Sequence, residues 1–213
     1  FNGSIDEFKI YSRALSASEI AAGYTSQSIT LNAIATKLMG DDDFDPAATA
    51  SSGLPVTYTS SDTTVAKIVD GKVHVLATGT STITASQSGN NVYWPATSQT
   101  KVLSVVITNN TPPTTLIGRP FTYTVTNKPL SNFAATGLPA GLSINAATGV
   151  ISGTPTVSGT FPVILTASNG SSTGTQTITL TIQSIVVSNV VAEAGDAKNI
   201  LEWDAIPGFT YNV

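Results

Sequence analysis

Hydrophobic and polar residues alternate with a period of two over most of the chain after residue 25. Successive side chains of a β-strand point to opposite faces, so this alternation predicts strands with one buried face. Threonine recurs on the other face, where its β-branched side chain suits a pleated, solvated surface. The positions expected to face inward are Val56, Tyr58, Val73, Val75, Ile83, Ala85, Phe121, Tyr123, Val125, Ile178, Leu180 and Ile182, and those expected to face outward are Thr122, Thr124, Thr126, Thr177, Thr179 and Thr181.

Short clusters of Gly, Pro, Asn and Ser separate these segments. Asp70-Gly71 and Asn169-Gly170 stand between alternating runs, and such pairs are strong hairpin signals. Short antiparallel strands at this spacing are typical of β-sandwiches. The pattern therefore predicts an all-β fold.

One short helix is expected near the N-terminus. Ser16 and Glu19 have the spacing of a capping box, in which each side chain accepts a hydrogen bond from the other's backbone amide. Leu15 and Ile20 occupy the two positions of a hydrophobic staple, and Gly23 can end the helix. The helix is predicted over residues 17–22, after a strand over residues 5–11.

A weak internal repeat suggests two modules of similar size. Residues 79–86 and 159–168 both begin with Gly-Thr and end with Thr-Ala-Ser, and each is followed by a polar loop and a final strand. Residues 109–113 (Asn-Asn-Thr-Pro-Pro) lie between the modules. Because proline favours extended chain, this joint is predicted to be short and semi-rigid.

The composition excludes several classes of site. The chain has 213 residues, of which 10% are charged, with no Cys and one His, His74. Without Cys there is no disulfide framework and no thiolate zinc site. His74 has only Asp70 near it in sequence as an acid, so no catalytic residue and no cofactor-binding residue is predicted. No apolar run approaches the roughly 18 residues of a membrane helix, so no membrane span is expected in this fragment.

The charges are unevenly placed. Residues 71–192 contain no Asp or Glu, and their four bases, Lys72, Lys101, Arg119 and Lys128, are scattered. Tracking of nucleic-acid phosphates needs clustered bases, so nucleic acid is not an expected partner.

The two ends of the chain resemble parts of larger domains. Residues 1–20 resemble the closing strand and helix of a laminin-G-like (concanavalin-type) jelly roll of bacterial surface proteins, which assigns residues 1–24 to its C-terminal end. Residues 184–213 resemble the first strands of a fibronectin type III domain, with Trp203 as its core tryptophan and residues 205–208 (Ala-Ile-Pro-Gly) as its first turn. Both domains are expected to be truncated, as in a piece of a larger secreted protein.

The middle of the chain resembles two immunoglobulin-like (Ig-like) modules. Residues 40–44 (Gly-Asp-Asp-Asp-Phe), 52–60 and 79–86 are similar to the MBG-type bacterial Ig-like repeat, which assigns residues 25–108. Residues 137–142 (Gly-Leu-Pro-Ala-Gly-Leu) and 148–155 (Thr-Gly-Val-Ile-Ser-Gly-Thr-Pro) resemble the "putative-Ig", cadherin-like module, which assigns residues 109–183. The resemblances imply tandem Ig-like β-sandwiches.

Four acids form the densest carboxylate group: Asp41, Asp42, Asp43 and Asp45. Such hard oxygen ligands could hold calcium, although their spacing is not that of a calcium loop. The alternative is a solvated acidic turn, as charge runs usually are.

Two further candidate sites concern carbohydrate. Trp94, with Tyr93 beside it, is a candidate glycan contact, because apolar sugar faces pack on aromatic rings. The alternative places Tyr93 in the core and Trp94 against a neighbouring module. Thr63 follows Asp62 in a pattern that resembles an O-glycosylation acceptor of Bacteroidota.

These features predict a non-enzymatic stalk of a large secreted or cell-surface bacterial protein, adhesin-like, which spaces a distal binding head from the surface. Its expected partners are neighbouring modules of the same polypeptide, and glycans or surface proteins. The alternatives are an accessory spacer of a secreted polysaccharide-degrading enzyme, or modules that bind glycan directly.

Overall fold

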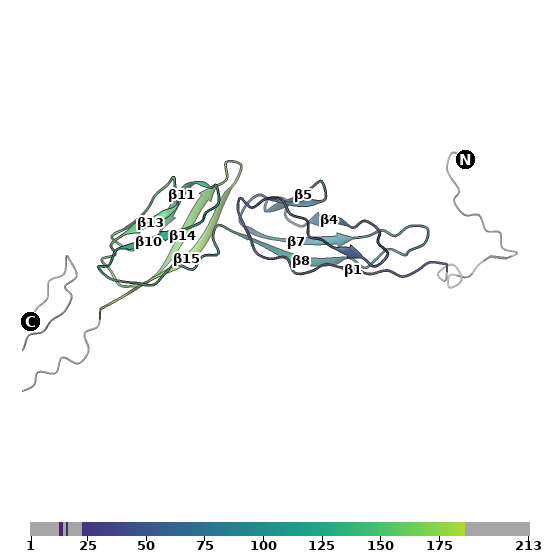
Figure 1. The fold of residues 1–213 in the computed structure, drawn as a ribbon, viewed down its shortest axis with the longest axis horizontal. Helices are drawn as coiled ribbons and strands as arrows, with labels where there is room; N and C mark the ends of the chain where they lie inside the picture. Colours follow the sequence, from purple (N-terminus) through teal and green to yellow (C-terminus); the bar gives the residue numbers. More distant parts are fainter. Residues whose placement is uncertain (1–12, 15, 17–22, 186–213) are drawn as a thin grey trace, which may run out of the picture.

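The computed structural model describes residues 13, 14, 16 and 23–185. These residues form an all-β structure of two bodies that lie end to end along the long axis (Figure 1). We call residues 23–108 the first half and residues 109–185 the second half. Within these ranges the structure has no helix, and none that could span a membrane. The helix predicted over residues 17–22, and nearly all of the laminin-G-like and fibronectin-like segments, lie outside the described residues.

The strands of the first half are mostly short, and two of them run for eight residues. They are β1 (Ile29–Thr30), β2 (Lys37–Leu38), β3 (Thr49–Ala50), β4 (Thr57–Ser60), β5 (Ala66–Val69), β6 (Lys72–Val75), β7 (Gly79–Ser86) and β8 (Gln99–Val106). A four-stranded sheet has the order β2-β8-β7-β4, and β5-β6 and β1-β3 form two small sheets. β2 runs parallel to β8, with Lys37 opposite Val105.

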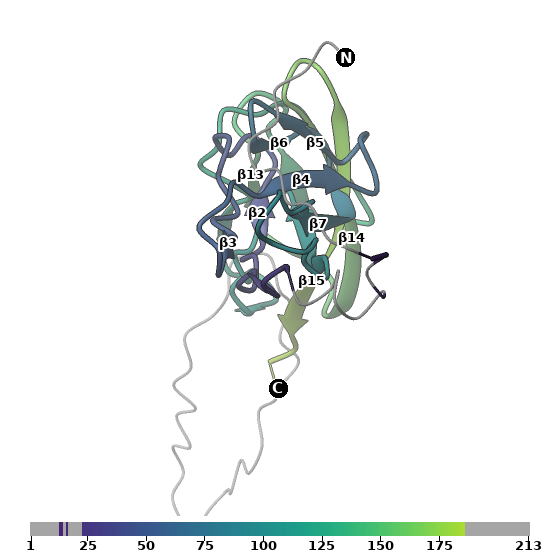
Figure 2. The same cartoon turned by 90° about the vertical axis from the view of Figure 1, so that its right-hand side faces the viewer.

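The second half is built around one long hairpin. Its strands are β9 (Thr115–Leu116), β10 (Phe121–Thr124), β11 (Ser131–Thr136), β12 (Leu142–Ile144), β13 (Val150–Gly153), β14 (Gly159–Ser168) and β15 (Thr173–Gln183). A sheet of order β11-β14-β15-β9 and a sheet of order β10-β13-β12 make it up. In the hairpin of β14 and β15, ten residues of each strand are paired: Gly159 lies opposite Ile182 at one end, and Ser168 lies opposite Thr173 at the other. A view along the long axis shows β14 and β15 beyond β4 and β7 of the first half (Figure 2).

Both predicted hairpins are confirmed. β5 and β6 are joined by Asp70 and Gly71, whose φ angles are 49° and 75°. Two successive residues with positive φ match the type I′ turn, which follows the twist of the strands, and Asp-Gly is favoured there. β14 and β15 are joined through Asn169 and Gly170.

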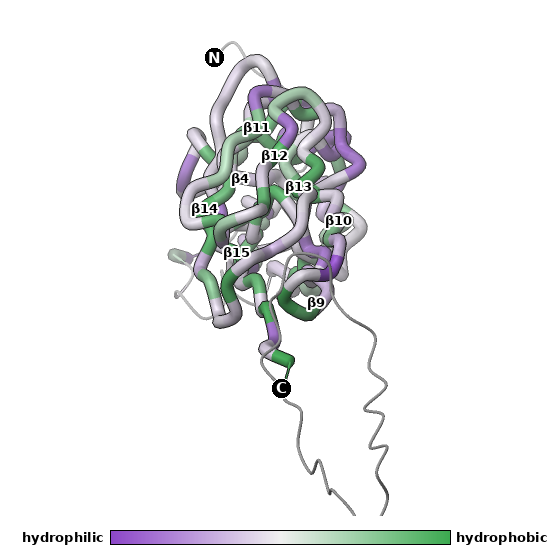
Figure 3. The backbone as a smooth tube through the Cα atoms, turned by 90° about the vertical axis from the view of Figure 1, so that its left-hand side faces the viewer, coloured by the Kyte–Doolittle hydropathy of each residue, from purple (hydrophilic) through white to green (hydrophobic). Residues whose placement is uncertain are grey.

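The core confirms the predicted alternation. Hydrophobic stretches alternate with polar ones along β14 and β15 (Figure 3). Of the twelve positions expected to face inward, ten are buried, and Val56 and Tyr58 are half-buried. The expectation that Thr126 faces outward is wrong, because Thr126 is only 5% exposed. β10 ends at Thr124, so the period of two no longer applies at Thr126, whose hydroxyl instead accepts a hydrogen bond from the Lys128 amide.

Candidate functional site

Polar and apolar contacts join the two halves where they meet. We call this contact the joint: residues 39–41, 76–78, 107 and 108 of the first half against residues 128–130 and 169–176 of the second, with residues 109 and 110 of the linker beside them. A hydrophobic core cluster runs through it, from Val105 and Met39 on one side to Leu130 and Leu180 on the other. The joint is therefore a packed interface between sandwiches as well as a chain connection.

Met39 is the apolar centre of the joint. It is the sequence's single methionine, and its side chain is fully buried. It lies against Gly174 of β15, where a Cβ would be 2.8 Å from the Met39 Sδ and 2.6 Å from the Thr78 Cγ2. Non-bonded heavy atoms prefer separations of about 3.5–4.0 Å. A side chain at position 174 would therefore force Met39 and Thr78 to shift, and glycine permits the observed close approach.

Gln176 joins the halves by hydrogen bonds. Its Oε1 accepts from the backbone amides of Ile107 at 2.8 Å and Thr108 at 2.9 Å, and its Nε2 donates to the Thr108 carbonyl at 2.8 Å. Ile107 and Thr108 follow the end of β8 and are buried. Their backbone groups are therefore beyond the hydrogen bonds of the sheet and are also shielded from water. A buried backbone group without a partner is costly, and one side-chain amide satisfies three of them.

The turn after β14 and the start of β15 add two hydrogen bonds across the joint. The Asn169 Nδ2 donates to the Leu76 carbonyl at 3.1 Å, and the Thr175 amide donates to the Thr78 Oγ1 at 2.9 Å. Gln176, Asn169 and Thr175 all belong to the β14–β15 hairpin, so the longest hairpin of the second half carries most of the polar contact.

An ion pair between Lys128 and Asp41 also connects the two halves at the joint. The Lys128 Nζ lies 2.6 Å from the Asp41 Oδ1, and the Asp41 Oδ2 accepts from the Leu38 amide at 2.8 Å. Burial acts to raise the pKa of Asp41, but the hydrogen bonds from Lys128 and Leu38 and the charge of Lys128 outweigh it and hold the pKa below its ordinary value. The hydrogen bond and charge of Asp41 raise the pKa of Lys128. The pair stays ionised at neutral pH.

The linker between the halves is tied to the second half. The Tyr123 hydroxyl donates to the Asn110 carbonyl at 2.9 Å, and the Asn110 amide donates to the Thr108 Oγ1 at 3.0 Å. Burial raises the pKa of Tyr123, so the hydroxyl keeps its proton for this bond. An open, polar cleft of about 550 Å³ lies beside the linker, lined by Asp41, Lys128, Asn109 and Asn127 among others.

Three of the four carboxylates proposed as a calcium site each interact with a different partner. Asp41 bonds Lys128 across the joint, the Asp43 Oδ1 lies 2.6 Å from the His74 Nδ1, and Asp45 accepts from the Ala47 amide at 2.8 Å. Asp42 is exposed. Among the described residues no three His, Asp or Glu side chains are placed to hold a metal ion. Calcium binding by Asp41, Asp42, Asp43 and Asp45 stays a prediction, as does the solvated acidic turn.

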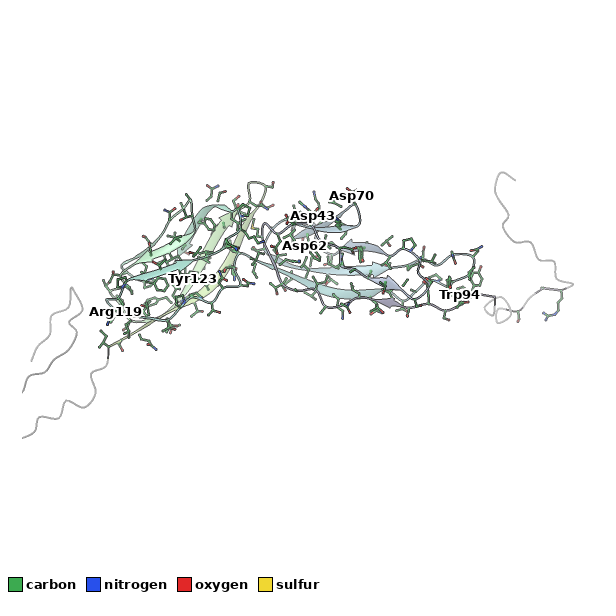
Figure 4. The ribbon with its side chains drawn as sticks, in the orientation of Figure 1. Asp43, Asp62, Asp70, Trp94, Arg119 and Tyr123 are labelled. Carbon is green, nitrogen blue, oxygen red and sulfur yellow. The ribbon has the colours of Figure 1, made fainter. Side chains whose placement is uncertain are left out.

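His74 is also placed differently from its sequence context. Its partner is Asp43, 31 residues away, and not Asp70. Both side chains are about 40% exposed and lie on the edge of the first half, where Figure 4 labels Asp43, Asp62 and Asp70.

Trp94 and Tyr93, the candidate glycan contact, differ in exposure and in their partners. Trp94 lies at the end of the first half that is far from the joint (Figure 4), and its ring packs against Tyr24 with centroids 4.6 Å apart. Tyr93 is half-buried and forms an isolated bridge with Thr25.

Thr63, the candidate acceptor for O-glycosylation, is exposed in the turn between β4 and β5. The Asp62 Oδ1 accepts from the Thr64 Oγ1 at 2.6 Å and from the Thr64 amide at 2.9 Å. These hydrogen bonds hold the pKa of Asp62 below its ordinary value. The turn therefore has a defined shape, with Thr63 at its surface.

The sequence matches one protein-family model, described as "Putative Ig domain", over residues 90–183. The match covers β8, the linker and every strand of the second half, so the chain contains an Ig-like module. No curated protein is similar enough to the sequence to count as a match.

Solved structures resemble parts of the chain. A "putative alpha-galactosidase/melibiase" of Bacteroides fragilis is 30% identical over 34% of this chain, with a TM-score of 0.31, and the match spans only 17% of that protein. Drosophila N-cadherin EC1-4 is 8% identical, with a TM-score of 0.32, over 75% of this chain and 50% of that one. The S-layer protein rSbsC(31-844) is 14% identical, with a TM-score of 0.27, over 75% of this chain and 28% of that one. At these TM-scores none of the similarities assigns a function.

Proposed function

We propose that this chain is a rigid, non-enzymatic spacer within a larger secreted or cell-surface bacterial protein. The joint is the observation that carries the proposal. A flexible tether needs no packed contact between its modules, whereas here Met39, Gln176 and the Asp41–Lys128 pair hold one half against the other. Contacts of this kind restrict relative domain motion, which is otherwise the default.

The surface suits a spacer. Exposed threonines such as Thr177 and Thr179 cover the outer face of β15, and only 10% of the sequence is charged. Hydroxyl groups keep a sheet face hydrated without a strong field of one sign, which would attract charged polymers. We also propose the finer assignment made from the sequence: an MBG-type repeat, then a cadherin-like Ig module, between the end of a laminin-G-like domain and the start of a fibronectin type III domain, in an adhesin-like protein.

A distance measurement tests the spacer. The sequence has no Cys, so two introduced cysteines can carry spin labels without background. We place them by Thr100→Cys in β8 and Thr179→Cys in β15, both exposed and one in each half. Pulsed electron spin resonance should give one narrow distance distribution, and Gly174→Val should broaden it because the side chain forces the halves apart.

Gln183→Ala, an exposed position of β15 away from the joint, is the control and should leave the distribution narrow. A broad distribution in the unaltered chain, unchanged by Gly174→Val, would mean that the halves move independently, and the proposal would be wrong.

A further inference from the structure

Two exposed aromatic rings lie at the end of the first half that faces away from the joint. Tyr24 is 37% exposed and Trp94 is 39% exposed, with their rings tilted by 34° and centroids 4.6 Å apart. Val92, 47% exposed, belongs to the same loop. We call Tyr24 and Trp94 the aromatic pair. Large apolar groups that gather on a surface mark a contact with something else.

The aromatic pair is held in place by the backbone. The Thr25 amide donates to the Val92 carbonyl at 2.7 Å, and the Trp94 amide donates to the Thr25 carbonyl at 3.0 Å. This short parallel bridge fixes the residue before Thr25 next to Trp94. The rings are therefore positioned before any ligand arrives, which lowers the entropy lost on binding.

The side chain of Gln27 holds the loop of Trp94 by hydrogen bonds. Its Nε2 donates to the Trp94 carbonyl at 2.7 Å and to the Gln87 Oε1 at 2.6 Å. The Asn90 Oδ1 accepts from the amides of Val92 and Tyr93, both at 2.9 Å. A network of side-chain amides and backbone groups therefore shapes the loop.

Three segments of the described residues around the aromatic pair carry no charge. Residues 23–36, 46–61 and 86–100, which supply β1, β3, β4 and the loop of Trp94, contain no Asp, Glu, Lys, Arg or His. Side-chain amides and hydroxyls are the polar groups there. In these three segments a charged polymer finds no counter-charge, whereas a neutral polyol finds groups that both donate and accept hydrogen bonds.

We propose that Tyr24 and Trp94 form a binding site for a neutral polysaccharide chain. One face of a sugar ring presents C–H groups, which pack on aromatic rings, and its edge presents hydroxyls, which bond to amides and hydroxyls. This site pairs Trp94 with Tyr24 in place of Tyr93, because the rings of Tyr24 and Trp94 are in contact whereas Tyr93 is half-buried. It adds glycan contact to the proposed spacer and does not depend on the joint.

Affinity gel electrophoresis with named probes tests the site. The neutral probes are laminarin, galactomannan and arabinoxylan, and alginate and heparin are the charged ones. The full chain should be retarded by at least one neutral probe and by neither charged one. Tyr24→Ala and Trp94→Ala should each weaken that retardation about tenfold, which corresponds to the loss of one stacked ring. Tyr93→Phe and Val157→Ala, an exposed apolar position in the second half, are the matched controls and should leave it unchanged.

Fluorescence separates a binding site from a covered patch. The sequence has two tryptophans, so Trp203→Phe leaves Trp94 as the only source of tryptophan emission. Its emission should be quenched by acrylamide in the free protein and protected by the binding probe. Protection already present without sugar would mean that another part of the chain covers the aromatic pair, and the proposal would be overturned. It would be overturned equally if no neutral probe retards the chain, or if Tyr24→Ala, with an unchanged melting temperature, binds as the unaltered chain does.

Discussion

Gln176→Ala is the sharpest test of how the joint is held. The substitution leaves the amides of Ile107 and Thr108 and the Thr108 carbonyl without their partner, at residues that are at most 2% exposed. An intramolecular hydrogen bond contributes about 1 kcal/mol net, and an unsatisfied buried group costs about 1–3 kcal/mol. Because the smaller side chain lets water reach part of the site, we expect the free energy of unfolding to fall by about 2–3 kcal/mol.

The measurement is urea unfolding of the full chain, followed by circular dichroism and checked by thermal melting. If the two halves unfold together, this loss of unfolding free energy corresponds to a melting temperature lower by about 5–10 °C. Gln183→Ala removes the same side chain from the exposed end of β15 and should change stability by less than about 0.5 kcal/mol. If Gln176→Ala costs no more than this control, the three hydrogen bonds do not hold the joint and the reasoning is refuted.

Three further predictions concern the joint and the acidic turn. Gly174→Val should destabilise the chain by about 1–3 kcal/mol through overpacking, and a single unfolding transition as stable as the original would contradict the close approach of Met39. The pKa of Asp41 is lower in the folded state, so its contribution is present at neutral pH and is lost as the pH falls below about 4. Lys128→Met should therefore be less stable than the original chain at pH 7, and the difference in urea midpoint should close at low pH. A difference that persists at pH 2 would count against the ion pair. For calcium, Asp41, Asp43 and Asp45 already have separate partners, so we expect equal melting temperatures in EDTA and in millimolar calcium, and a rise of more than about 2 °C with calcium would show a site.

The sequence pattern predicted the strands because their cause is local. A period of two follows from strand geometry, and the buried face of β15 needs only Ile178, Leu180 and Ile182 at alternate positions. The turn at Asp70-Gly71 is equally local, since it depends on the φ angles that these two residues adopt readily. The pattern gave a wrong orientation at Thr126, where the strand has ended.

Partners far apart in the sequence were not predictable from it. His74 finds Asp43 rather than Asp70, and Trp94 finds Tyr24 rather than Tyr93. In both cases the sequence-based interpretation chose a partner that is close in the sequence. The folded chain instead brings together residues on neighbouring segments, whose separation of 31 or 70 positions leaves no signal in a single sequence.

The sequence by itself determined an all-β chain in two parts, with polar outer faces, no thiol chemistry and a proline-containing linker, because composition and alternation act residue by residue. Only the tertiary structure decided that the two parts pack against each other. Gly174, Gln176 and Lys128 are unremarkable where they stand in the sequence. They become a joint because the β14–β15 hairpin packs against Met39 and the end of β8, and that approach depends on how the two halves fit together in space.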